Sequence, residues 1–175
     1  VLSAIAPHLE HAAYVGLVHA GEPMLAPLFE PFLEELRRRR DGHPTIVHLL
    51  TNGMALTDAK LRRVIELGVR SLSFSLDGMS ASTNDVLRIG SKSELLLDRI
   101  ARTVEIAHKS GVRVGLSWVV TQANVDELAA LVRFASSSKL DWLKLEELFV
   151  RDETILHLAV DRYALDVAVA NSRKI

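Results

Sequence analysis

Short apolar runs alternate along this chain with longer segments in which apolar residues recur every three or four positions. The short runs are rich in β-branched residues, and nearly continuous apolar runs are typical of strands buried in a parallel sheet. The longer segments have the period of amphipathic helices. The pattern therefore predicts five strands, at Ala13–Val18, Thr45–Leu50, Ser71–Leu76, Arg113–Val120 and Trp142–Phe149.

Helices are predicted before, between and after these strands. Thr57 is placed to cap one helix and Gly68 to end it, since glycine tolerates the left-handed backbone common at that position. Asn124 followed by Glu127 has the pattern of a capping box. Apolar stripes at helical spacing also lie near residues 25–36, 97–107, 128–135 and 155–171, and the chain up to about His11 has the pattern of a helix end.

Regular alternation of helix and strand predicts an α/β fold with one parallel sheet. A single domain over residues 1–175 is expected, because no linker or change of composition divides the chain. Five strands without an internal repeat suit a doubly wound sheet or part of a (β/α) barrel. A closed eight-stranded barrel is not expected, since it needs about 250 residues.

Composition narrows the classes of function. With 49% hydrophobic and 25% charged residues and a net charge of -1, the chain lacks the basic surface that nucleic acids require. No apolar stretch approaches the ~20 residues of a membrane helix, and the N-terminus lacks a signal-peptide pattern, so we expect a cytoplasmic protein. The basic run Arg37–Arg40 is interpreted as solvated charge at a helix end. The absence of cysteine excludes disulfides and thiolate metal sites within the chain.

Polar residues gather where each predicted strand gives way to a helix, the edge at which parallel α/β sheets bind ligands. Other interpretations exist, since Asn-Gly and Asp-Gly are common turns and Asn124 suits a helix cap. Glu22 is harder to explain in that way, because a carboxylate at a buried strand end needs a partner, such as a ligand ammonium group. The clusters are His19–Pro23, Thr51–Gly53, Ser75–Gly78, Thr121–Asn124 and Glu146–Glu147.

In order along the chain, these junctions resemble motifs of the radical S-adenosylmethionine (SAM) superfamily. The likeness runs from about Ala13 to Leu148. The matching segments are Ala20-Gly21-Glu22-Pro23 (similar to Gly-Gly-Glu-Pro, with Ala for the first Gly), Thr51-Asn52-Gly53 (Thr-Asn-Gly), Ser75-Leu76-Asp77-Gly78 (Ser-Ile/Leu-Asp-Gly), Asn84-Asp85 with Arg88 and Gly90 (His-Asp-x-x-Arg-x-Gly), and Val119-Val120-Thr121 with Asn124 (the fifth strand and its exit).

The resemblance implies an incomplete (β/α)6 partial TIM barrel, with a parallel sheet and helices on its outer face, that holds SAM across the carboxyl ends of its strands. In that superfamily a [4Fe-4S] cluster reductively cleaves SAM to a 5′-deoxyadenosyl radical, which abstracts hydrogen from the substrate. The motif set leans toward enzymes that modify peptides or make cofactors, and it assigns no catalytic residue. By position, the implied SAM contacts are Gly21 and Glu22 to the amino group, Thr51 and Asn52 near the ribose or the substrate, and Ser75 and Arg88 to the carboxylate, with Asp77 bracing its loop.

The superfamily holds its cluster with three cysteines in a Cys-x3-Cys-x2-Cys loop after the first strand, and this chain has none. By the motif count that strand and loop would lie before Val1, so we expect a fragment of a radical SAM core that is inactive alone. The alternative is a degenerate binding domain that has lost the cluster. The histidines supply no replacement, since His8 and His11 form a pair without a nearby carboxylate.

Two other classes of function have less support from the sequence. A nucleotide binder on a doubly wound sheet would need a glycine-rich turn before a helix, and neither G-x-G-x-x-G nor a P-loop occurs. A non-catalytic interaction domain would show an exposed apolar patch in place of polar strand ends. The expected partners are a small-molecule or peptide substrate and, through the open edge of Ala13–Val18, further copies of the chain.

Overall fold

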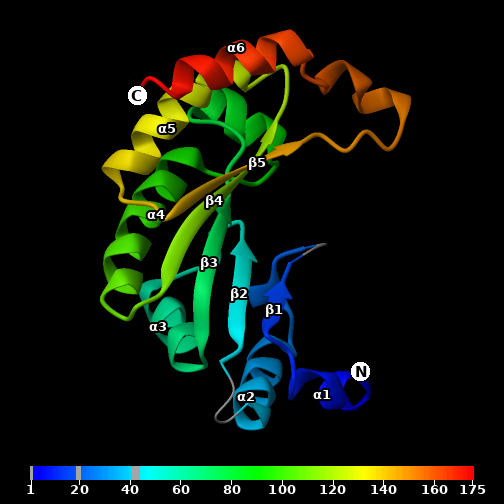
Figure 1. The fold of residues 1–175 in the computed structure, drawn as a ribbon, viewed down its shortest axis with the longest axis vertical. Coiled ribbons are helices and arrows are strands. Elements are labelled where there is room, and N and C mark those ends of the chain that lie inside the picture. The colour runs from blue at the N-terminus through cyan, green and yellow to red at the C-terminus, as the bar shows by residue number, and fades with distance from the viewer. Residues whose placement is uncertain (1, 19–20, 41–43) are drawn as a thin grey trace.

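The structure is a computed structural model that describes residues 2–18, 21–40 and 44–175. All five strands lie in one parallel sheet, in the sequence order β1-β2-β3-β4-β5, as the alternation predicted (Figure 1). The strands are β1 (Tyr14–Leu17), β2 (Ile46–Thr51), β3 (Val69–Ser75), β4 (Arg113–Val120) and β5 (Trp142–Glu147).

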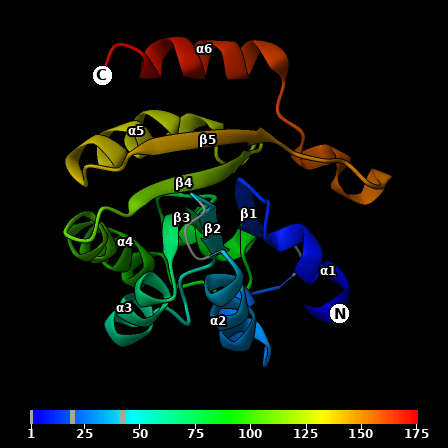
Figure 2. The same ribbon diagram turned by 60° about the horizontal axis from the view of Figure 1, so that its bottom comes forward.

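The sheet curls into a half-barrel and helices cover its outer face, which confirms the predicted partial barrel (Figure 2). One prediction needs correction: the segment near 155–171 is not one helix, because Asp161 interrupts it and caps α6 through the N–H groups of Tyr163 and Ala164. The helices are α1 (Leu2–Leu9), α2 (Phe29–Arg39), α3 (Asp58–Glu66), α4 (Ser93–His108), α5 (Leu128–Ser137) and α6 (Arg162–Ser172), with short helical turns at Pro23–Leu25, Ala81–Asp85, Val125–Glu127 and Glu153–Leu158.

The core lies between the convex face of the sheet and the helices. On β3, Leu72 and Phe74 point outward and are fully buried, whereas Ser71 and Ser73 alternate with them on the inner face. Burying a Leu or Phe side chain contributes about 1.5–3 kcal/mol, so the outer face of each strand fixes the sheet against α2–α5. The strand β3 therefore differs from strands with nearly continuous apolar runs, because its residues alternate with a period of two.

The strand β1 pairs only with β2 among the described residues and forms one edge of the sheet, as predicted. The strand β5 forms the opposite edge. Whether copies of the chain associate through β1 stays a prediction. In the part of the chain that the structure describes, no helix is both long and apolar enough to cross a membrane.

The arginine run at the end of α2 makes specific contacts and is more than solvated charge. Arg39 bridges Glu35 of its own helix at 2.6 Å and Glu10 beyond α1 at 2.9 Å. Arg40 donates to the carbonyl oxygens of Thr45 at 2.9 Å and Gly68 at 3.0 Å, just before β2 and β3. These contacts tie α2 to the amino-terminal side of the sheet, a role that helical periodicity did not reveal.

Hydrogen bonds from Arg38 and Arg39 lower the pKa of Glu35 from its ordinary value of 4.5 to about 2. A carboxyl group with a lowered folded pKa stabilises the fold above its unfolded pKa, and that contribution is lost as the pH falls toward 2. We therefore expect Glu35→Gln to remove part of the acid sensitivity of the urea midpoint between pH 4.5 and 2. The exposed Glu153→Gln should retain it, and equal pH profiles for the two variants would contradict the assignment.

Candidate functional site

The carboxylate of Glu22 joins the ends of β1 and β2. Its Oε1 accepts a hydrogen bond from the Thr51 hydroxyl at 2.8 Å, and its Oε2 accepts one from the backbone N–H of Asn52 at 2.7 Å. Gly21 precedes it with a φ of 95°, a conformation that glycine adopts without strain. Among the predicted site residues, Thr51 and Asn52 therefore contact Glu22, and Gly21 precedes it in the chain. Ala20 and His19, at the start of the same predicted cluster, lie outside the described residues.

The Thr51-Asn52-Gly53 segment is a turn held by its own side chains. Thr51 is buried, and its hydroxyl accepts from the N–H of Gly53 at 2.9 Å while it donates to Glu22. Asn52 is exposed, and its side-chain oxygen accepts from the N–H of Met54 at 2.9 Å. Thr51 thus orients Glu22, whereas Asn52 is open to a ligand at the strand end.

Beyond β3, Arg88 lies against Asp77, with Arg88 Nε 2.7 Å from Asp77 Oδ2. The contact is an ion pair without the alignment of a hydrogen bond. The other oxygen of Asp77 accepts from the N–H of Val119 at 2.8 Å. Burial raises the pKa of Asp77, and the Arg88 charge opposes that shift. Asp77 therefore braces the loop, as expected, and also orients Arg88. Ser75 is nearly buried on β3, in register with Ser117 of β4.

Buried amides hold the loop between β3 and α4. Asn84 accepts from the Asp77 N–H at 3.0 Å and donates to Ser91 at 2.8 Å. Asn124 donates to the carbonyl oxygens of Asp77 and Val119. The capping box predicted at Asn124 is wrong, because neither that side chain nor Glu127 caps α5. Glu127 instead accepts from the Met79 N–H and from the hydroxyls of Ser80 and Thr83. The Asn124-x-x-Glu127 pattern fits both a capping box and the observed contacts with the loop, since both arrangements need only a side-chain acceptor.

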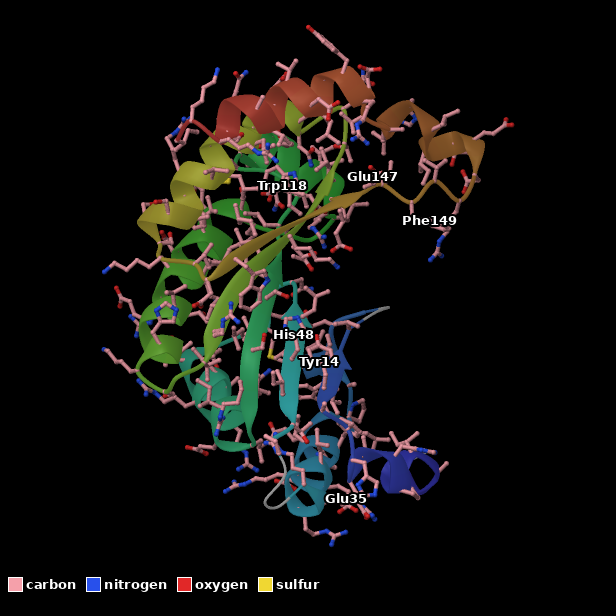
Figure 3. The ribbon with its side chains drawn as sticks, viewed as in Figure 1. Tyr14, Glu35, His48, Trp118, Glu147 and Phe149 are labelled. Atoms are coloured by element: carbon pink, nitrogen blue, oxygen red, sulfur yellow. The ribbon has the colours of Figure 1, made fainter. Side chains whose placement is uncertain are left out.

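A cavity of about 550 Å³ lies on the concave face of the half-barrel. Sequence reasoning missed it, although the alternation of serine with apolar residues along β3 was a visible signal. The sequence pattern assigned His48 no role, yet its side chain is half-buried on β2, near Tyr14 (Figure 3). Its ring nitrogens lie 2.8 Å from Ser71 Oγ and 3.0 Å from Ser73 Oγ. The lining residues are Tyr14, Val18, His48, Leu50, Ser71, Ser73, Ser117, Trp142, Lys144 and Glu146.

The charges in this cavity are compensated. Hydrogen bonding from the Ser117 hydroxyl, with a further contribution from Lys144, lowers the pKa of Glu146. Lys144 Nζ lies 3.0 Å from Glu146 Oε2. Burial, and then the charge of Lys144, lowers the pKa of His48. These shifts favour the carboxylate form of Glu146 and the neutral form of the His48 imidazole.

The six predicted site residues form two groups along the carboxyl edge of the sheet. Gly21, Glu22, Thr51 and Asn52 belong to the ends of β1 and β2, while Ser75 and Arg88 lie at and beyond the end of β3. None of the six lines the cavity. Ser117 connects the two regions, because it pairs with Ser75 in the sheet and also lines the cavity.

These features define a class: a parallel (β/α) half-barrel with polar groups at the carboxyl ends of its strands. A family model described as the Radical SAM superfamily matches residues 9–135, and the chain belongs to that superfamily. The fold agrees, since a structure of anSMEcpe with bound AdoMet superimposes with a TM-score of 0.74, at 16% identity, over 98% of this chain and 47% of the other. Streptococcus suis SuiB gives 0.72, at 15% identity, over 92% and 36%.

Two curated relatives are similar in sequence. The pre-heme d1 synthase of Dinoroseobacter shibae is 28% identical over 165 residues, which cover 89% of this chain and 38% of the relative. A protein of Pyrococcus furiosus that modifies the cofactor of tungsten-containing aldehyde ferredoxin oxidoreductase is 28% identical over 138 residues, covering 77% and 37%. The chain therefore spans less than two fifths of the length of either relative.

The side chains fit the two cofactors of the superfamily unequally. The chain has no cysteine, and among the described residues no group of three His, Asp or Glu side chains could hold a metal ion. Thiolates are the usual ligands of a [4Fe-4S] cluster, so these residues do not fit one. The strand ends do fit a zwitterion such as SAM, since Glu22 offers acceptors and Arg88 offers donors.

The ion pair of Asp77 and Arg88 yields a stability test. Asp77→Ala leaves the Arg88 guanidinium without its ion-pair partner and the Val119 N–H without an acceptor, so the free energy of unfolding should fall by about 1.5–3 kcal/mol. Asp77→Asn keeps an oxygen for the Val119 N–H and should lose less. Urea denaturation measures both, with the exposed Asp126→Ala as the control. Equal stability of Asp77→Ala and the control would remove the bracing role.

Proposed function

We propose that this chain is the SAM-binding part of a radical SAM enzyme whose cluster ligands come from residues outside these 175. The observation that carries the proposal is the Glu22 carboxylate, held at the mouth of β1 by Thr51 and Asn52. The ordered motifs along the carboxyl edge and membership of the superfamily support it. When bound, the cofactor pair supplies reductive cleavage of SAM and a radical that abstracts hydrogen.

Glu22 is suited to hold the SAM amino group. A carboxylate has about four lone-pair positions. Short hydrogen bonds from Thr51 and Asn52 use two of them, and a longer one from the Met24 N–H at 3.5 Å uses a third. The remaining position can accept from an ammonium group, and the three hydrogen bonds fix the carboxylate beforehand. Gly21 lets the backbone turn next to the carboxylate, because its φ of 95° is a conformation that residues with a side chain rarely adopt.

Arg88 and Ser75 are suited to hold the SAM carboxylate. The contact with Asp77 uses Arg88 Nε, and the guanidinium has further N–H donors on its terminal nitrogens. Such donors can bind a carboxylate in a bidentate manner. Ser75 contributes a hydroxyl on the inner side of β3. Thr51 supports Glu22, and Asn52 is left to contact the ribose or the substrate.

The substrate is proposed to be a small molecule or a peptide. The sequence relatives include a pre-heme d1 synthase and a cofactor-modifying protein, and a structural neighbour was crystallised with its precursor peptide SuiA. A second candidate function is a degenerate SAM-binding domain without redox chemistry. The absence of cysteine is the observation that favours this alternative.

Cluster chemistry separates the two proposals. The 175 residues alone should stay colourless after anaerobic reconstitution with iron and sulfide, because no thiolate is present. They should yield no 5′-deoxyadenosine with SAM and dithionite. A fusion that places a three-cysteine cluster loop before the chain should become coloured on reconstitution and should yield 5′-deoxyadenosine. Chromatography decides the outcome: 5′-deoxyadenosine from the chain alone contradicts the main proposal, and none from a cluster-loaded fusion favours the degenerate domain.

Substitution of Glu22 tests the SAM site within that fusion. Glu22→Gln keeps one oxygen, which can accept from the Asn52 N–H while the amide nitrogen faces the Thr51 hydroxyl, but it loses the charge that attracts an ammonium group. The affinity for SAM should fall by about 1–3 kcal/mol, the range for a hydrogen bond to a charged group. Calorimetry measures it, with the exposed Glu30→Gln on α2 as the matched control. If both variants bind SAM as the parent does, Glu22 does not hold the cofactor.

A further inference from the structure

The cavity on the concave face is walled by aromatic rings from three strands. The rings of Tyr14 and His48 stack with centroids 6.1 Å apart, and the ring of Trp142 lies 6.2 Å from that of His48. The strands β2 and β5 are not neighbours in the sheet, so it is the curl of the half-barrel that brings His48 and Trp142 together. The whole chain is only 5% aromatic, and it places one of its two tyrosines and one of its two tryptophans here.

The indole of Trp142 lies flat against β4. A Cβ added at Gly115 would stand 2.2–2.4 Å from three atoms of the ring, which means that the Cα–H of Gly115 faces the plane of the indole. Gly115 and Trp142 are partners in the sheet register, so any larger residue at position 115 would push the ring away. The indole is therefore held along the cavity wall. The Arg113 guanidinium lies over the same ring, with its Cζ 5.3 Å from the ring centroid, and the Arg113 side chain is 68% exposed. A planar ligand that stacks on the indole must share or displace this contact.

His48 is held as firmly as the indole. Its two ring nitrogens contact Ser71 Oγ and Ser73 Oγ, which flank it on β3. One nitrogen of a neutral imidazole donates and the other accepts, and a serine hydroxyl can serve either. Tyr14, on the edge strand, is 57% exposed. The cavity thus combines two fixed rings with one accessible ring.

The polar side of the cavity carries both an acceptor and a donor. Glu146 is held by Ser117 and Lys144, and its side chain remains 37% exposed. Lys144 is 64% exposed beside it. A ligand carboxylate near Lys144 would also face the Glu146 carboxylate. A ring N–H would find an acceptor in Glu146, and a ring nitrogen or carbonyl would find a donor in Lys144.

We propose that this cavity binds a planar nitrogen heterocycle, stacked on the Trp142 platform with its ring N–H directed to Glu146. The inference rests on the proposed function, because Ser117 joins the cavity to Ser75 at the SAM site, and the heterocycle is the part of the substrate that lies below SAM. Stacking of a heterocycle on an aromatic side chain tolerates many ring types, and the hydrogen bonds select among them.

Lumazine, a planar pteridinedione with ring N–H groups, is a suitable probe. Trp118→Phe leaves Trp142 as the only tryptophan, and Trp118 is buried on the opposite face of the sheet. Lumazine should quench Trp142 fluorescence saturably in this variant. By calorimetry, Trp142→Leu should weaken lumazine binding roughly tenfold, as expected for loss of a stacking platform. Trp118→Phe should bind as the parent chain does.

Glu146→Gln should weaken lumazine binding about tenfold, as loss of a hydrogen bond to a charged group does. The same substitution should leave 1,3-dimethyllumazine unaffected, because that probe has no N–H to donate. Naphthalene-2-carboxylate, which is planar but carries a carboxylate, should bind more weakly than lumazine. Circular dichroism confirms that each variant is folded.

The proposal is overturned if lumazine does not bind, if Trp142→Leu binds it unchanged, or if naphthalene-2-carboxylate binds as tightly. These measurements need neither SAM nor a cluster. If the lumazine predictions fail while the cluster-loaded fusion still binds SAM, only the proposed heterocycle site is contradicted. Lumazine binding together with loss of the SAM site would remove the proposed function and leave the cavity assignment in place.

Discussion

The structure depends on a sheet that is covered by helices on one face only. Because side chains alternate between the two faces of a strand, this constraint divides each strand into an apolar outer set and a largely polar inner set. On β3 the outer set is Leu72 and Phe74, fully buried, and the inner set is Ser71, Ser73 and Ser75. The same parallel order brings all five strand ends to one edge. The cavity on the inner face and the candidate SAM site at the strand ends both follow from this arrangement of the sheet.

Loops at that edge are fixed by buried polar groups. Asp77 and Asn124 link the exits of β3 and β4, and Asn84 adds a third link to the loop that carries Arg88. Buried amides and carboxylates are tolerated because their hydrogen bonds are satisfied within the loop. A site built this way is positioned before a ligand arrives, which lowers the entropy cost of binding.

The two halves of the candidate site have different physical characters. At the ends of β1 and β2, Glu22 is a carboxylate that accepts hydrogen bonds from the Thr51 hydroxyl and from the backbone N–H groups of Asn52 and Met24. In the cavity, Glu146 is compensated by Lys144, and aromatic rings dominate the wall. The first arrangement suits a cationic group and the second suits a neutral planar ring. Because Ser75 and Ser117 connect the two regions, a ligand at the strand ends could approach a ligand in the cavity across the same inner face.

The five strands, their parallel order, the open edge at β1 and the ordered motifs of the superfamily could all be predicted from the sequence alone. These features follow from local periodicity and from residues near each other in the chain. Three contacts became visible only in the folded chain: His48 faces Ser71 and Ser73, Trp142 lies over Gly115, and Glu127 accepts hydrogen bonds from the loop after β3. The reason is physical: curling of the sheet brings together residues that are far apart in sequence, and a polar residue's pattern does not specify which distant partner its hydrogen bonds will reach.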